Sequence, residues 1–111
     1  MDEELGQEKG VASSAMKIVW TDQALANLIS IREYIAEGSE QNAIVVSERI
    51  LECVRPLATQ PEIGRRGEVP GTRQLVVPRT PYVIVYRIRE GGLRLLAVLH
   101  GRQQGPESFE N

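Results

Sequence analysis

The chain has 111 residues, which is enough for one domain of typical size and too few for two. Its hydrophobic content of 41% and charged content of 25% are those of a globular protein and exclude a chain that is disordered throughout. The small net charge of −2 combines an acidic N-terminal half with an arginine-rich C-terminal half.

Neither a membrane span nor a secretory signal is visible. No apolar run approaches the roughly 20 residues that a membrane span needs, and the N-terminus lacks the charged-then-apolar order of a signal peptide. The single cysteine, Cys53, has no partner for an internal disulfide and lies in an apolar helical pattern. We therefore expect a cytoplasmic protein that makes no contact with a membrane.

Residues 1–15 are acidic and lack apolar periodicity, so we expect a disordered extension. A strand-like run follows at residues 16–20, and Thr21 or Asp22 is a candidate N-cap for a helix. That amphipathic helix is expected to end near Gly38 in a left-handed conformation. Its buried stripe is predicted from residues at helical spacing: Ala24, Leu25, Leu28, Ile31 and Ile35.

A second helix is expected after Ser39. Proline in a helix interior removes a hydrogen bond and costs about 3 kcal/mol, so Pro56 predicts that this helix kinks or ends close to Arg55. Its buried face is predicted to hold Ala43, Val46, Ile50, Val54 and Leu57.

The second half of the chain reads as a loop followed by a small sheet. Proline and glycine recur between Pro61 and Gly71 and predict an irregular loop. Three strands are expected at residues 73–77, 82–88 and 93–99, with Gly91-Gly92 as the hairpin turn. The folded domain is then 16–104, and residues 105–111 form a flexible tail.

Strand alternation assigns the side chains to two faces. In the middle strand Tyr82, Ile84, Tyr86 and Ile88 share one face, and Val83, Val85 and Arg87 share the other. In the last strand Arg94, Leu96, Val98 and His100 alternate against Leu93, Leu95, Ala97 and Leu99. Both faces are largely apolar, and two helices cover only one of them, so the second face predicts a partner.

Residues 63–102 hold eight arginines and two acidic residues, Glu68 and Glu90, a local charge of 8 − 2 = +6. Forked guanidinium groups suit carboxylates and phosphates. A solvated face of the sheet is the alternative interpretation. The arginines are Arg65, Arg66, Arg73, Arg79, Arg87, Arg89, Arg94 and Arg102.

Little in the sequence indicates a catalytic centre. One histidine and one cysteine fit no common zinc spacing, and no phosphate-binding loop occurs, so we expect neither a metal nor a cofactor. His100 is the only histidine and would serve as an acid or base, or as a structural or partner contact. Tyr82 and Tyr86 are typical of half-buried strand aromatics.

Four motifs, in this order and spacing, resemble the ParE/RelE toxin superfamily from Met16 to about Gln104. They are Gly64-Arg65, Gly71-Thr72-Arg73-Gln74-Leu75, Tyr82-Val83-Ile84-Val85-Tyr86-Arg87 and Val98-Leu99-His100-Gly101-Arg102. The resemblance implies an α+β fold of order βααβββ, in which a two-helix hairpin packs on one face of a small, twisted, mainly antiparallel sheet. It also implies a growth-inhibiting toxin of a type II pair, neutralised by a cognate antitoxin.

The superfamily contains two mechanisms. RelE-type members are ribosome-dependent messenger RNA endoribonucleases, and ParE-type members inhibit DNA gyrase. RelE-type chains typically carry an arginine where this chain has Val83, and often use lysines, whereas the only lysines here are Lys9 and Lys17. A valine cannot donate a hydrogen bond to a phosphate, so a ParE-like gyrase inhibitor is favoured over a ribonuclease.

The alternatives stay open at this point: a ribonuclease, or a non-toxic protein-interaction module. A ribonuclease would draw its site from Arg65, Glu68, Arg87, His100 and Arg102. The candidate partner-binding residues are Arg73, Arg79, Tyr82, Arg87, Arg94, His100 and Arg102. The first helix offers only Arg32 as a basic group, so contact with DNA is expected only through the antitoxin.

Overall fold

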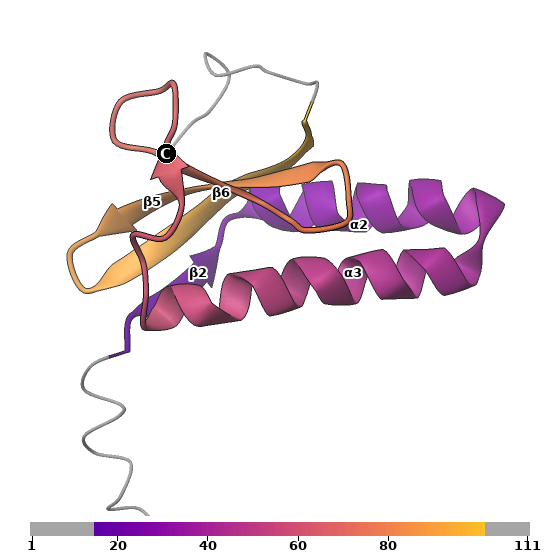
Figure 1. The fold of residues 1–111 in the computed structure, drawn as a ribbon, viewed down its shortest axis with the longest axis horizontal. Coiled ribbons are helices and arrows are strands. Elements are labelled where there is room, and N and C mark those ends of the chain that lie inside the picture. The colour runs from indigo at the N-terminus through magenta and orange to yellow at the C-terminus, as the bar shows by residue number, and fades with distance from the viewer. Residues whose placement is uncertain (1–14, 102–111) are drawn as a thin grey trace, which may run out of the picture.

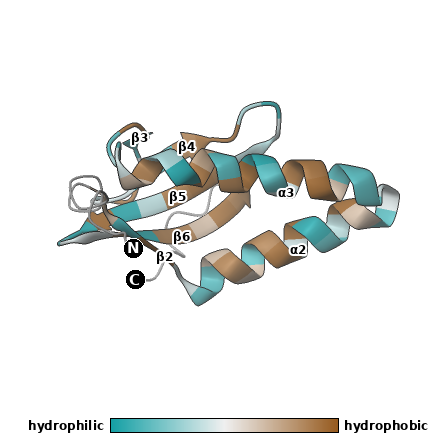
Figure 2. Cartoon of the chain, turned by 90° about the horizontal axis from the view of Figure 1, so that it is seen from below, coloured by the Kyte–Doolittle hydropathy of each residue, from teal (hydrophilic) through white to brown (hydrophobic). Residues whose placement is uncertain are grey.

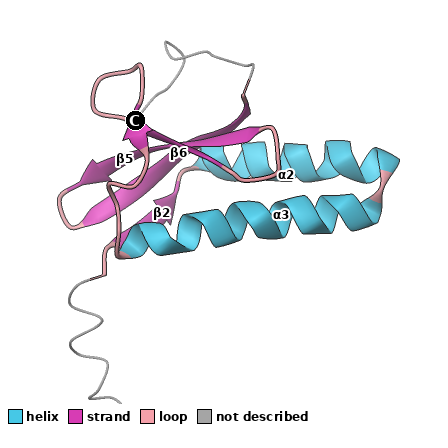
Figure 3. Cartoon of the chain, in the orientation of Figure 1, coloured by secondary structure: helices cyan, strands magenta, loops and turns pink. Residues whose placement is uncertain are grey.

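The computed structural model describes residues 15–101 as two helices packed on one side of a sheet (Figures 1 and 3). The elements are β2 (Lys17–Trp20), α2 (Asp22–Gly38), α3 (Glu40–Val54), the 3₁₀ helix η1 (Arg55–Ala58), β3 (Arg65–Arg66), β4 (Arg73–Val76), β5 (Tyr82–Arg89) and β6 (Gly92–His100). The α+β prediction is confirmed. The predicted extension, apart from Ala15, and the 105–111 tail lie outside the described residues.

The sheet has the order β2-β6-β5-β4-β3, in which β2 runs parallel to β6 and the other neighbours are antiparallel. The short β3 strand was not predicted, and it extends the sheet beyond β4. Among residues 15–101, no helix is long and apolar enough to span a membrane.

Side-chain caps fix where α2 begins and where the two helices meet. The Thr21 hydroxyl accepts a hydrogen bond from the Ala24 N–H at 3.1 Å and donates to the Leu95 carbonyl at 2.7 Å, so it also ties the helix to β6. Ser39 is extended, with φ −166°, and its hydroxyl accepts from the Asn42 N–H. The left-handed ending predicted for Gly38 is wrong, because Ser39 alone redirects the chain and Gly38 stays helical.

Proline ends α3 as predicted. The α-helix stops at Val54, and the chain continues as η1 with Pro56 in its first turn. Figure 2 shows hydrophobic and hydrophilic residues alternating in blocks along α2 and α3, as expected of amphipathic helices.

The main core lies between the helices and the sheet. Leu25 was predicted to join it but is 47% exposed, because it lies beside the buried stripe rather than on it. Full burial of one valine, leucine or isoleucine side chain in this core stabilises the fold by about 2 kcal/mol. The buried members are Ala24, Ile50, Val54, Leu57, Val77, Tyr82, Ile84, Tyr86, Leu93, Leu95 and Val98.

A bulge in β6 changes the predicted faces of that strand. Val85 pairs with Ala97 and Tyr86 with Leu95, so Leu96 is an extra residue opposite β5. Val98 therefore joins the helix-side core, and Ala97 joins Val85 on the other face, contrary to simple alternation. β2 pairs with β6 only as far as Leu95. Beyond that point, the Asn27 side chain of α2 accepts a hydrogen bond from the Val98 N–H at 3.1 Å.

The hairpin turn lies one residue earlier than predicted. Arg89 pairs with Gly92, so the turn residues are Glu90 and Gly91. Gly91 has φ +70°, a left-handed conformation that glycine adopts without steric cost.

The face of the sheet away from the helices has a small apolar centre, which is closed. Val85, Leu96 and Ala97 are each at most 2% exposed, and Leu99 packs against them. Among residues 15–101, the large apolar side chains of this face that are exposed lie toward its margins, Val19 at 37% and Val76 at 57%. The expected broad, open apolar face is therefore wrong at its centre.

Candidate functional site

The arginines divide between the two faces of the sheet. Arg73 lies opposite Tyr86 of the helix-side core, and Arg66 lies opposite Arg73, so both belong to that face near the β3 edge. The other face carries Arg87 and Arg94, which lie opposite each other, together with Arg65 and Arg89 by strand alternation. Six of the eight arginines thus form two groups, Arg79 lies in the turn between β4 and β5, and Arg102 lies outside the described residues.

Arg87, like Arg73, is only partly exposed, whereas the other arginines of these two groups are exposed. It is half-buried, and its Nη1 lies 3.6 Å from the position that a Cβ on Gly71 would take. Within residues 15–101, its Nε is the buried side-chain polar atom that has no hydrogen-bond partner. A buried donor left unpaired costs about 1–3 kcal/mol, which an acceptor supplied by a ligand or partner would offset.

A hydrogen-bond network around Tyr86 fixes the loop that precedes β3. The phenol donates to the Pro61 carbonyl at 2.7 Å and accepts from the Gly64 N–H at 2.9 Å. Arg73 Nη1 donates to the Gly64 carbonyl at 2.7 Å. Burial raises the pKa of Tyr86, and the Gly64 hydrogen bond and the Arg73 charge oppose that rise.

A hollow of about 440 Å³ lies between α2 and the C-terminal end of β6. The rings of Tyr82 and His100 meet edge to face there, and their centroids are 5.7 Å apart. Burial, followed by the nearby Tyr34, raises the pKa of Tyr82. The hollow is lined by Asn27, Ser30, Ile31, Tyr34, Tyr82, Val98, Leu99 and His100.

Arg79 occupies the tip of the turn between β4 and β5 in a left-handed backbone conformation, with φ +62°. It is exposed, and its carbonyl accepts a hydrogen bond from Arg49 Nη1 at 3.2 Å. Among residues 15–101 it is the non-glycine residue with a positive φ. Such strain persists where the surroundings impose it and is concentrated at functional sites.

The sequence model of the ParE toxin of the type II toxin–antitoxin system parDE matches residues 18–105. The chain belongs to this ParE toxin family. The ParE/RelE resemblance is therefore confirmed, and membership of a ParDE-type system implies a cognate antitoxin as partner.

Relatives and a solved structure agree with the family match. Y4kP of Sinorhizobium fredii, provisionally named as a toxin, is 39% identical over 94 residues, or 85% of this chain and 97% of that protein. Toxin RelE2 of Caulobacter vibrioides is 36% identical over 84 residues, or 76% and 93% of the two chains. The structure of the chromosomal ParDE system from P. aeruginosa matches with a TM-score of 0.71 at 29% identity, covering 78% of this chain and 97% of that one.

Among the candidate ribonuclease residues that the structure describes in this ParE-family chain, His100 lies apart from Arg65 and Glu68. Arg65 and Glu68 are exposed near the β3 edge, whereas His100 lines the hollow beside α2. Arg87 lies against Gly71, and Arg102 lies outside the described residues. Within residues 15–101, no group of three or more histidine, cysteine, aspartate or glutamate side chains is placed to hold a metal ion.

Among the candidate partner residues, Tyr82 and His100 share the hollow, Arg87 and Arg94 share the opposite face, and Arg73 and Arg79 lie apart from both groups. Sequence reasoning missed Asn27, Ser30 and Tyr34 as lining residues. The signal was present, because these three residues recur at helical spacing and lie beside the Ile31 position of the predicted stripe.

Proposed function

We propose that this toxin stops growth by inhibiting DNA gyrase and that its antitoxin neutralises it by covering the arginines on the face away from the helices. Membership of the ParE family supports the first part. The second part rests on the like charges of Arg87 and Arg94, which lie directly opposite each other and suit an acidic partner segment.

The observation that carries the gyrase proposal is an apolar row across three strands. Val76 lies opposite Val83, and Val83 lies opposite Leu99. RelE-type ribonucleases, which this chain resembles in fold, typically place a phosphate-contacting arginine at the Val83 position. None of the three side chains can donate a hydrogen bond to a phosphate, and one such donor is commonly worth about 3 kcal/mol in a transition state.

The positions of the acid–base candidates support the same proposal. A base that activates a ribose hydroxyl must lie within about 3 Å of it, close to the groups that hold the phosphate. His100 faces Tyr82 in the hollow beside α2, whereas Glu68 is exposed in the loop before β4. The described lining residues of that hollow include no arginine.

A ribosome-dependent ribonuclease is the second candidate. The observation that favours it is the 36% identity with a protein named toxin RelE2. In that case His100 would transfer a proton, and the edge-to-face contact with Tyr82 would position the His100 imidazole.

Purified toxin should be tested on gyrase and on ribosomes in parallel. The gyrase proposal predicts loss of DNA supercoiling, intact messenger RNA on the ribosome, and unchanged gyrase inhibition in His100→Gln. Cleavage of ribosome-bound messenger RNA that disappears in His100→Gln, with supercoiling unaffected, would replace this proposal with the ribonuclease.

A further inference from the structure

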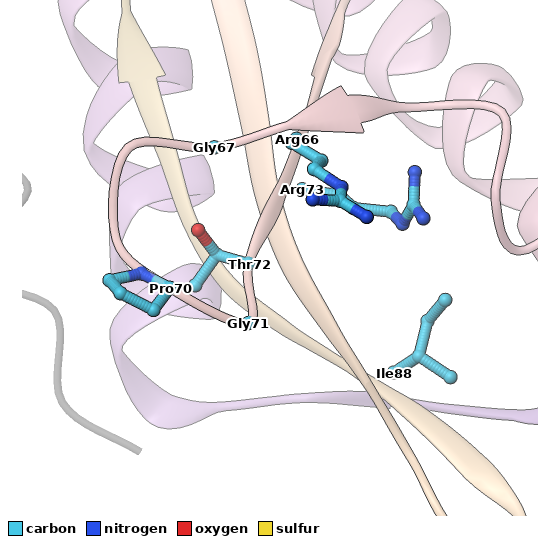
Figure 4. A pocket seen from close by; sticks show the side chains of 7 residues that line it. All are labelled: Arg66, Gly67, Pro70, Gly71, Thr72, Arg73 and Ile88. Atoms are coloured by element: carbon cyan, nitrogen blue, oxygen red, sulfur yellow. The ribbon is translucent and has the colours of Figure 1, made fainter.

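Two arginines face each other at the edge of the sheet where β3 pairs with β4. Arg66 lies directly opposite Arg73, and Figure 4 shows both side chains extending into the same space above Ile88. Like charges directly opposite each other weaken an antiparallel strand pair. The described residues that line this pocket include no aspartate or glutamate to offset the two charges.

Arg73 is held in place by the protein itself. Its Nη1 donates to the Gly64 carbonyl at 2.7 Å and more weakly to the Glu62 carbonyl at 3.4 Å. Gly64 is fixed in turn by Tyr86. A positively charged group that is already oriented binds an anion without an additional ordering cost, and the exposed Arg66 is placed to close on that anion from the facing strand.

The pocket is larger than a simple ion requires. Its volume is about 490 Å³, within the range of about 300–1,000 Å³ found for small-molecule sites. Ile88 and Pro70 provide apolar walls, and Gly71 and Thr72 form the turn that closes one side (Figure 4). Beyond Gly71, the Arg87 guanidinium adds a third positive charge close to the same wall.

From this geometry we infer that the pocket binds a phosphate monoester of about the size of a mononucleotide, with its phosphate between Arg66 and Arg73. A phosphate monoester carries about −1.5 to −2 charges at neutral pH and three acceptor oxygens, which match two guanidinium groups. A single carboxylate carries only one charge. The apolar walls then contact the organic part of the ligand. This inference does not depend on which target the toxin attacks.

Calorimetric titration of the full chain with adenosine 5′-monophosphate, inorganic phosphate and adenosine tests the inference. We expect 1:1 binding of the nucleotide, at least tenfold weaker binding of phosphate, and no binding of adenosine. If inorganic phosphate binds as tightly as the nucleotide, the phosphate contact stands, but the claim that the pocket selects a ligand the size of a mononucleotide is wrong. If adenosine binds as tightly as adenosine 5′-monophosphate, the phosphate makes no contribution and the proposed Arg66–Arg73 site is wrong.

Variants with the same change of charge locate the ligand. Arg66→Gln should weaken nucleotide binding at least tenfold, whereas Arg94→Gln, on the other face of the sheet, should change it less than twofold. Arg66→Glu should raise Tm without ligand, because it pairs with Arg73, and should abolish nucleotide binding. Equal weakening in Arg66→Gln and Arg94→Gln, or full affinity in Arg66→Glu, would overturn the assignment.

Discussion

The two faces of the sheet use similar strand positions in different ways. On the helix-covered face, Tyr86 is fully buried and its hydroxyl has two hydrogen-bond partners, while Arg73 is held by backbone carbonyls. On the opposite face, Arg87 keeps a buried, unpartnered Nε and faces Arg94. Around Tyr86 the first face is satisfied internally and stabilises the fold, whereas the second leaves charge and hydrogen-bonding capacity for a partner.

The largest loss of stability is expected at Gly64, where the backbone and the Tyr86 hydroxyl leave the least room for a side chain. A Cβ on Gly64 would lie 2.6 Å from the Tyr86 hydroxyl and 2.8 Å from the Gln74 carbonyl, so Gly64→Ala should lower the free energy of unfolding by about 3 kcal/mol. The control is Gly38→Ala, because no atom beyond its own stretch of helix lies within 4 Å of its Cβ position, and alanine is favoured in a helix by about 0.5–1 kcal/mol. Urea denaturation measures both, and equal stability of the two variants would contradict the close approach at Gly64.

Removal of the Tyr86 hydroxyl tests the same network with a smaller expected loss of stability. Tyr86→Phe leaves the buried Gly64 N–H and the Pro61 carbonyl unpaired and should cost about 2 kcal/mol at neutral pH. Burial raises the pKa of Tyr86 above its ordinary value of about 10. The folded state therefore retains this proton longer than the unfolded state, so the Tyr86 contribution is complete below pH 10 and declines as the pH rises further. The stability difference between wild type and Tyr86→Phe should narrow above pH 10 in alkaline urea titrations, and a difference that widens would refute this.

The turn at Arg79 should show a smaller effect. A left-handed conformation costs a residue with a Cβ about 1–2 kcal/mol, so Arg79→Gly should be more stable than Arg79→Ala by about 1 kcal/mol. If Arg79 contacts the target or the antitoxin, both variants lose that contact to the same degree. Thermal unfolding compares their stability, and equal Tm values would show that the backbone is not strained there.

The smallest effect on stability is expected on the second face. Arg94 is exposed and lies opposite Arg87, so Arg94→Glu replaces a like-charge pair with an opposite-charge pair and should raise the free energy of unfolding by only about 0.5 kcal/mol. The same change places a negative charge where an acidic antitoxin segment is proposed to dock, and it should weaken the complex at least tenfold in calorimetry. Unaltered affinity for the antitoxin would remove Arg94 from the interface.

The helices and strands were predictable because their apolar residues repeat with the period of the element. Ile50 and Val54 recur at helical spacing, and Ile84 and Tyr86 alternate along β5. Elements that are very short, or that form only by pairing with another strand, were not predictable. The two residues of β3 form a strand only because β4 lies beside them, and periodicity cannot appear in so short a segment.

The candidate site was predictable in composition but not in arrangement. The surplus of arginine is visible in the sequence, whereas its division between two faces depends on the registers Arg66–Arg73 and Arg87–Arg94. The bulge at Leu96 depends on pairing with β5, so alternation along β6 assigned Val98 to the wrong face. Arg79 lies between two prolines in Pro78-Arg79-Thr80-Pro81, a pattern that predicts a turn without indicating the sign of its φ.

The order in which synthesis stops after induction tests the gyrase proposal most directly. The toxin would be induced in bacteria without its antitoxin, and incorporation of labelled thymidine and labelled methionine would be followed over the first minutes. The proposal predicts that thymidine incorporation falls first and methionine incorporation later. A collapse of methionine incorporation while DNA synthesis continues would contradict it and identify protein synthesis as the process attacked.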